Sequence, residues 1–171
     1  GIHISSTGIY QGLSGVVDER SELQLTQPRV ALLAAGEQAL QQQGSWLTLR
    51  LSGLMGPGRH PGRFAQGRVL SGATQPVNMV HSADVAAAVL KILSRWPLPH
   101  ACYNLSSPQR VTKTEFYQAA ANSLGQVADS IDLSGPATEP ARQVSSSAFC
   151  QDSGFAFRFA DARAALAYCP D

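Results

Sequence analysis

The first sixty residues show a pattern of apolar and polar positions that predicts strand, helix and strand. Residues 2–4 begin a short strand that runs into a turn rich in serine. A helix should begin at Pro28 and end near Gly44, because these residue types suit the two ends of a helix. Residues 46–54 are expected to form a second strand. The stripe that supports the helix has spacings of three and four: Ala31, Leu32, Ala35, Ala39 and Leu40. This order predicts one βαβ unit of a parallel sheet.

The middle of the chain predicts two helices around a short strand. Residues 56–72 are rich in Gly, Pro and Arg, and we expect a loop there. Ser82 is a good N-cap for a helix over residues 84–96. A strand is expected at residues 101–105. Thr112 is followed three residues later by glutamate, which predicts a capping box and a helix that ends near Gly125.

The last third of the chain is more polar. Residues 126–147 are expected to form a long loop with one short strand at residues 131–133. Three phenylalanines alternate with other residues at positions 155, 157 and 159. This alternation is typical of a strand, and we expect a short alanine-rich helix after it.

Composition narrows the class of protein. The chain has 171 residues, of which 44% are hydrophobic, so it fits one domain of ordinary size with a real core. Its formal net charge of +1 gives no electrostatic reason to expect nucleic acid or an anionic membrane as a partner. Cys102, Cys150 and Cys169 are too widely spaced for a zinc site or a disulfide framework. We therefore expect no metal site and a reducing, cytoplasmic setting.

The first residues and the hydropathy pattern support the same setting. Residues 1–10 have neither a basic region nor a long apolar region, so they do not read as a signal peptide. No apolar run approaches the roughly 18 residues that a membrane span needs.

Five segments, in order along the chain, resemble motifs of the extended short-chain dehydrogenases and NAD-dependent epimerases. The segments are residues 5–10 (SSTGIY), 15–19 (GVVDE), 49–59 (LRLSGLMGPGR), 77–86 (VNMVHSADVA) and 103–105 (YNL). The tail from residue 142 to 166 is similar to the closing part of one subgroup of nucleoside-diphosphate-sugar epimerases. Each motif alone is weak, but five in the family order are specific.

The resemblance implies an α/β fold, namely the carboxy-terminal part of a Rossmann-like parallel sheet plus a small substrate domain. Residues 1–58 would form a partial βαβ unit, and residues 59–171 the substrate-type domain. The intact family is NAD(P)-dependent. The family's catalytic hydroxyl would be Ser6. The remaining site residues would bind cofactor (Ser5, Ser52, Gly53 and Leu54) or substrate (Thr7, Arg59 and Arg63).

Three departures from the family pattern change the expected function. The chain contains no GxxGxxG loop for a cofactor pyrophosphate, so we expect weak or no binding of NAD or NADP by this chain alone. The family's Tyr-x-x-x-Lys pair falls on Arg29 and Leu33. Arginine cannot act as a base at neutral pH, because its pKa exceeds about 12. The family's phosphate-binding arginine before His81 is replaced by Val77.

Two functions remain open from the sequence. The chain is either an incomplete, inactive piece of an NAD(P)-dependent epimerase or dehydratase, or a non-catalytic binding module that keeps the fold. In both cases the open edge of the sheet predicts self-association or pairing with a separate amino-terminal half.

Overall fold

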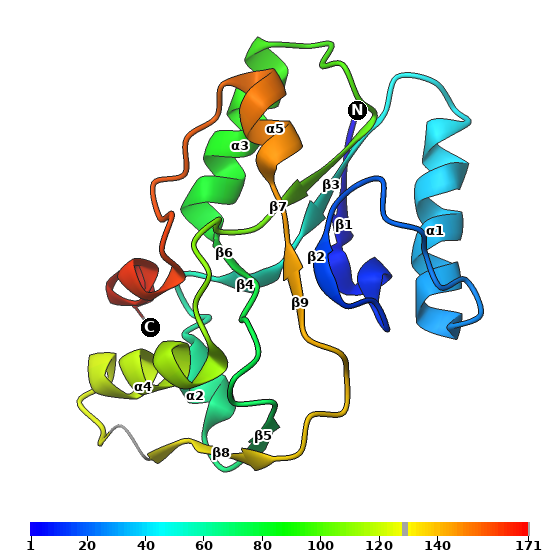
Figure 1. The fold of residues 1–171 in the computed structure, drawn as a ribbon. Helices are drawn as coiled ribbons and strands as arrows, with labels where there is room; N and C mark the ends of the chain where they lie inside the picture. The colour runs from blue at the N-terminus through cyan, green and yellow to red at the C-terminus, as the bar shows by residue number, and fades with distance from the viewer. Residues whose placement is uncertain (128–129, 171) are drawn as a thin grey trace.

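Three parallel strands form the centre of the molecule. The computed structural model describes residues 1–127 and 130–170. Strands β1 (Ile2–Ser6), β3 (Leu47–Leu51) and β7 (Cys102–Leu105) pair side by side in that order, and both pairings are parallel. The α/β fold with parallel strands that the sequence predicted is therefore confirmed (Figure 1).

Helices flank this sheet. Helix α1 (Pro28–Gln41) runs beside β1, whereas α3 (Ser82–Ser94) and α5 (Ser147–Ser153) lie toward β7 (Figure 1). The predicted capping box is present: Thr112 and Glu115 bond each other's backbone at the start of α4 (Lys113–Ser123). The remaining helices are short, namely α2 (Pro61–Ala65) and the 3₁₀ helices η1 (Thr7–Tyr10) and η3 (Ala162–Tyr168).

Six short strands pair two by two outside the central sheet. All three pairings are parallel and join segments far apart in the sequence. The pairs are β2 (Gly15–Val17) with β9 (Arg142–Val144), β4 (Gly53–Met55) with β6 (Met79–His81), and β5 (Val69–Ser71) with β8 (Asp132–Gly135). The β2–β9 pair matters most for the site, because it brings the tail of the chain back to the end of β1.

The core is built from two main groups of buried side chains. One lies between the central sheet and helices α3 and α5, and includes Leu49, Ile92, Tyr103 and Phe149. The other lies around α4 and η3, and includes Phe116. These fully buried side chains fix the sheet on which the candidate site is built.

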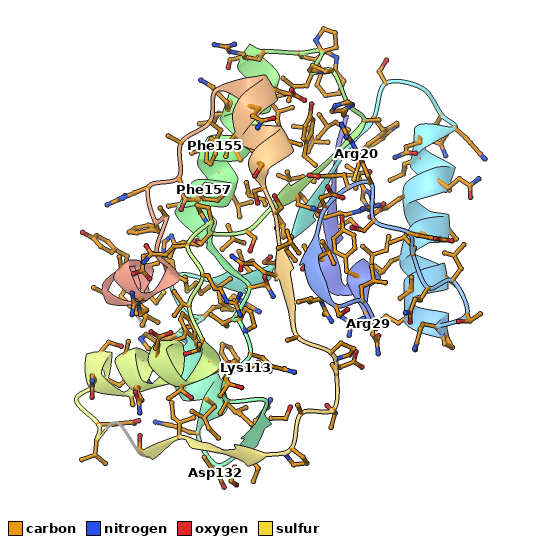
Figure 2. All side chains as sticks on the ribbon, viewed as in Figure 1. Arg20, Arg29, Lys113, Asp132, Phe155 and Phe157 are labelled. Carbon is orange, nitrogen blue, oxygen red and sulfur yellow. The ribbon has the colours of Figure 1, made fainter. Side chains whose placement is uncertain are left out.

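The phenylalanines at 155, 157 and 159 do not form the predicted strand. Their burial does alternate, since Phe155 and Phe159 are buried and Phe157 is half-buried. Among the described residues, however, no strand pairs with this segment, and the N–H groups of Arg158 and Phe159 donate instead to the carboxylate of Asp84, at 2.7 and 3.1 Å. Phe155 packs against Phe149, with ring centroids 5.2 Å apart (Figure 2). The alternation of the three phenylalanines therefore indicates which side chains are buried, but it does not indicate a paired strand.

Helix α1 also differs from the predicted stripe. Leu32 is 75% exposed, and the side chains that α1 buries fully are Val30 and Glu37. The buried glutamate is paired with Arg50, a contact that spacing of apolar residues could not predict. Helix α1 ends at Gln41, three residues before Gly44.

Three further expectations are corrected. His81 and not Ser82 caps α3, because its Nδ1 accepts the N–H of Ala83 at 3.1 Å. The expected loop at residues 56–72 contains α2 and β5, and the polar stretch at 126–147 contains β9 as well as β8. Within residues 1–127 and 130–170, no helix is long and apolar enough to cross a membrane.

Candidate functional site

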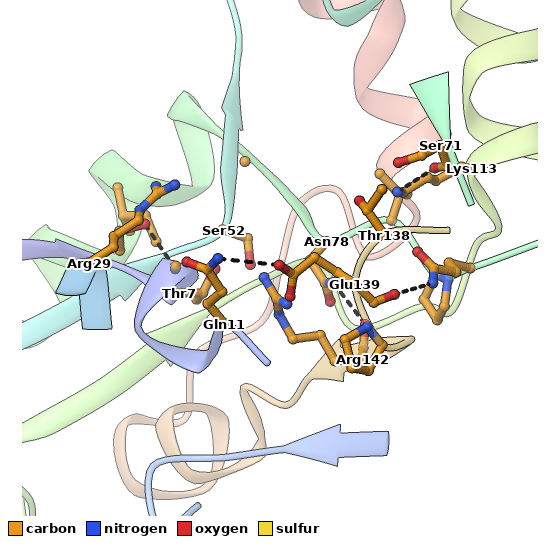
Figure 3. Close-up of a pocket in the computed structure, with 18 residues that line it drawn as sticks. Thr7, Gln11, Arg29, Ser52, Ser71, Asn78, Lys113, Thr138, Glu139 and Arg142 are labelled. Atoms are coloured by element: carbon orange, nitrogen blue, oxygen red, sulfur yellow. Dashed lines mark hydrogen bonds between the residues drawn. The ribbon is translucent and has the colours of Figure 1, made fainter. Parts of the chain in front are cut away.

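A pocket of about 520 Å³ opens at the carboxyl ends of β1 and β3 (Figure 3). Ser6 ends β1 and lies in register with Leu51, and both line the pocket with Ser52 and Gly53. Ligands bind at this edge in open α/β sheets, since loops diverge there and leave a crevice. The position of the pocket follows directly from the parallel pairing of β1 and β3.

Ser6 shapes the turn at the end of β1. Its Oγ accepts the N–H of Gly8 at 3.0 Å and so caps η1. A serine hydroxyl can also donate one hydrogen bond, and Ser6 Oγ donates none to residues 1–127 or 130–170. Space at Gly8 is tight, because a Cβ there would lie 3.1 Å from Nη2 of Arg29 and 3.2 Å from Oγ of Ser6.

Ser52 also lines the pocket, and its hydroxyl is buried. The residue is only 6% exposed, and its Oγ has no hydrogen-bond partner in the part of the chain that the structure describes. Buried polar atoms are nearly always paired, so each exception needs an explanation. A ligand in the pocket that Ser52 lines would provide the missing partner.

Three cationic side chains line the pocket, and each comes from a different element. They are Arg29 of α1, Lys113 of α4 and Arg142 of β9 (Figure 3). Nζ of Lys113 donates to the backbone oxygen of Ser71 at 2.8 Å. Burial and the neighbouring charge of Arg142 lower the pKa of Lys113. Burial also lowers the pKa of Arg142; Glu139 opposes this shift and Arg29 adds to it.

Glu139 is the acidic side chain among the residues that line this pocket. Its carboxylate accepts hydrogen bonds from Nε2 of Gln11 and from the N–H of Gly12, both at 3.2 Å. Gln75 donates to the backbone oxygen of Glu139 at 2.7 Å. These contacts tie the segment before β9 across the mouth of the pocket.

A buried polar network supports the sheet behind the pocket. Arg50 bonds both carboxylate oxygens of Glu37, with the shortest contact at 2.7 Å, and donates to the Tyr10 hydroxyl at 2.7 Å. That hydroxyl donates to Oδ1 of Asn104 at 2.9 Å. Burial raises the pKa of Tyr10 to about 12, although Arg50 lowers it. Tyr10 is therefore a neutral structural donor and not a catalytic base.

The structure brings four of the predicted site residues together and leaves four elsewhere. Ser6, Thr7, Ser52 and Gly53 line the pocket. The others do not line it: Ser5, Leu54, Arg59 and Arg63.

Local contacts explain these placements. Ser5 lies on the opposite face of β1 from Ser6, because side chains alternate along a strand, and its hydroxyl donates to Glu37 at 2.6 Å. Nε of Arg59 donates to the backbone oxygen of Leu54 at 3.3 Å, and its guanidinium lies over the ring of Phe64. Arg63 is exposed on α2.

Sequence reasoning missed Lys113 and Arg142. They lie 29 residues apart in the sequence and reach the pocket through α4 and β9. The β2–β9 pairing carries Arg142 there. No local motif marks either residue.

Comparison with known proteins gives one relative and a shared fold. No protein-family model matches the chain. Protein YeeZ of Escherichia coli (strain K12) is 33% identical over 173 residues, which cover 94% of this chain and 58% of YeeZ. The chain therefore spans less than two thirds of this curated relative.

Solved structures show the same partial coverage. A conserved protein of unknown function from Silicibacter pomeroyi has a TM-score of 0.78 at 22% identity, covering 96% of this chain and 64% of that protein. MoeE5 in complex with UDP-glucuronic acid and NAD has a TM-score of 0.77 at 20% identity, covering 98% of this chain and 62% of that protein. UDP-glucuronic acid 4-epimerase from Bacillus cereus in complex with NAD has a TM-score of 0.72 at 15% identity, covering 98% of this chain and 58% of that protein. The chain therefore has the α/β fold of about three fifths of an NAD-dependent epimerase/dehydratase structure.

Proposed function

We propose that this chain is the substrate-binding part of an NAD(P)-dependent nucleoside-diphosphate-sugar epimerase/dehydratase-like protein, and that it is inactive alone. One observation carries the proposal: Ser6 ends β1 in a polar pocket at the carboxyl edge of the parallel sheet, beside Ser52 and Gly53. In this proposal Ser6 holds a substrate oxygen, and Ser52 and Gly53 face the cofactor side of the cleft.

The residues present do not fit a complete dinucleotide site. MoeE5 and the Bacillus cereus epimerase are both solved with NAD, but these 171 residues contain no GxxGxxG loop for its pyrophosphate. Helix α1, one of the helices that begin beside the pocket, starts with Pro28, which has no N–H to offer a phosphate.

Titration calorimetry with NAD and NADP tests this assignment. We expect no dissociation constant in the micromolar range for either cofactor, because the chain lacks the loop that would bind the pyrophosphate. The Bacillus cereus epimerase, which is solved with NAD, is the positive control. A micromolar constant for this chain would contradict the proposal that the cofactor site is incomplete.

A second candidate is a binding module without catalysis, and the position of Arg29 favours it. Arg29 occupies the place where the resembling family has its tyrosine base, and it lines the pocket. Leu33, at the place of the lysine, packs against the apolar cluster of Ile9 and Val30. Neither side chain can remove a proton from a substrate hydroxyl at neutral pH. Reduction of NAD by the chain combined with a separate amino-terminal half, in the presence of UDP-glucuronic acid, would favour the enzyme. Tight binding of UDP-glucuronic acid without NAD reduction by that combination would favour the binding module.

The free edge of the sheet supports a proposal about partners. In the described sheet β1 pairs with β3 alone, and Ile4 is 48% exposed beside Leu32 at 75%. Both residues line a small groove between β1 and α1. We propose that this edge pairs with a second copy of the chain or with a separate amino-terminal half.

Sedimentation velocity of the purified chain tests whether the free edge at β1 causes self-association. We expect dimers or larger species, because an unpaired strand and exposed apolar side chains favour association. Ile4→Lys should shift the distribution toward monomer, and Val127→Lys, at an exposed residue that does not line the groove, should not. A stable, compact monomer of 18.1 kDa with a high Tm would contradict the proposal.

A further inference from the structure

We propose that the pocket at the carboxyl ends of β1 and β3 binds a ligand that carries a doubly charged oxyanion, as in a phosphate monoester, held by Arg29, Arg142 and Ser52. The inference rests on the proposed function in one respect, since it uses the same pocket. It requires neither NAD nor any residue outside the described chain.

The charges in the pocket are unbalanced. Arg29, Lys113 and Arg142 line it together with Glu139, which leaves a formal excess of two positive charges. The Glu139 carboxylate is bonded to Gln11 and to the backbone of Gly12. Across residues 1–127 and 130–170, neither arginine of the pocket forms an ion pair with a carboxylate within 4.0 Å. A dianion would balance this excess.

Burial makes the unbalanced charge costly. Arg142 is half-buried, and its pKa is lowered first by burial, while the charge of Arg29 lowers it further. Lys113 shows the same two effects, with Arg142 as the neighbouring charge. The cations therefore act on one another across a partly dehydrated space. An oxyanion between them would reverse the repulsion and supply acceptors for their N–H groups.

Ser52 gives an independent indication of a ligand. Its hydroxyl is buried at a residue that is 6% exposed, lines the same pocket, and has no partner among the described residues. An uncharged apolar ligand would leave this hydroxyl unpaired, whereas an oxyanion accepts its proton. The need for an acceptor at Ser52 thus agrees with the excess positive charge.

Arg29 also indicates which kind of ligand atom meets Ser6. Nη2 of Arg29 and Oγ of Ser6 lie 3.1 and 3.2 Å from the point where a Cβ of Gly8 would stand. The guanidinium and the hydroxyl therefore flank one small space above the turn. Both groups can donate to an anionic oxygen at that place, and the positive charge of the guanidinium favours an anion over an alcohol.

Binding of inorganic phosphate provides the test, with chloride at equal ionic strength as the reference anion. Titration calorimetry and the shift of Tm with phosphate are the two measurements. We expect phosphate to raise Tm more than chloride does, and to bind more weakly as salt increases. Arg29→Gln and Arg142→Gln should each weaken phosphate binding about tenfold or more, because each removes a charge-assisted hydrogen bond.

Two variants separate binding from folding. Arg68→Gln removes one positive charge from an exposed residue outside the pocket, and phosphate affinity should stay within about twofold. Ser52→Ala removes an unpaired buried hydroxyl, so Tm without phosphate should hold or rise while phosphate affinity falls. Equal effects of phosphate and chloride on the unaltered chain would overturn the proposal, as would equal losses in Arg68→Gln and Arg29→Gln. The NAD titration is independent, so the cofactor assignment and this inference can fail separately.

Discussion

Glu37→Ala is expected to lower the free energy of unfolding by about 3–5 kcal/mol, because it leaves a buried guanidinium without its carboxylate. Glu37 is 4% exposed and Arg50 is 7% exposed, and three hydrogen bonds join them. Burial opposes the charge on Arg50, but the hydrogen bonds to Glu37 outweigh it and raise the pKa of Arg50. The loss would also leave the hydroxyl of Ser5 without its acceptor. Chemical denaturation measures the change.

Two companion variants make this result specific. Glu22→Ala removes an exposed carboxylate and should change the stability by less than about 0.5 kcal/mol. Glu37→Leu combined with Arg50→Met replaces the pair by apolar side chains, and should recover much of the loss. A loss in Glu37→Ala no larger than in Glu22→Ala would show that the pair does not hold α1 on the sheet.

Asp84→Ala is expected to lower the free energy of unfolding by about 3 kcal/mol, since each hydrogen bond to a charged group contributes roughly 1.5–3 kcal/mol. The Asp84 carboxylate is fully buried and accepts the N–H groups of Arg158 and Phe159. It is therefore more than a charge at the start of α3, because it anchors the tail that packs against α3. Thermal unfolding should show Tm lowered by about 6–12 °C for a chain of this size.

An exposed carboxylate provides the matched control for Asp84. Asp132 is exposed and accepts the N–H of Ser134 at 2.9 Å. Asp132→Ala should lower the stability by less than about 1 kcal/mol, because water can replace an exposed acceptor. If Asp84→Ala and Asp132→Ala unfold at the same temperature, the tail is held by packing alone.

The elements predicted correctly from the sequence depend on contacts close in the chain. The capping box of Thr112 and Glu115 is formed by residues three apart, and Pro28 begins α1 as its missing N–H allows. The parallel pairing of β1 and β3 follows from the helix between them. Ser6 reached the predicted edge because it is the last residue of β1. Local signals of this kind are visible in one sequence.

The features that the sequence did not predict depend on contacts between distant segments. The pairing of β2 with β9 joins residues more than 120 positions apart, and together with the hydrogen bond from Asn78 to the backbone oxygen of Arg142 it brings Arg142 to the pocket. Asp84 takes the place of a partner strand for the segment at Phe159, which apolar alternation could not reveal. Arg59 was predicted to bind substrate from its place in a motif, but its guanidinium lies on Phe64 and outside the pocket.

A crystal structure of the chain grown with inorganic phosphate tests the central claim most directly, namely that the ligand site is the pocket at the carboxyl ends of β1 and β3. We expect a phosphate ion with oxygens within about 2.7–3.0 Å of the Arg29 or Arg142 guanidinium and of Ser52 Oγ. Phosphate bound only at the exposed arginines of the loop from 59 to 68, or a pocket that stays free of phosphate at concentrations where calorimetry shows binding, would contradict the claim.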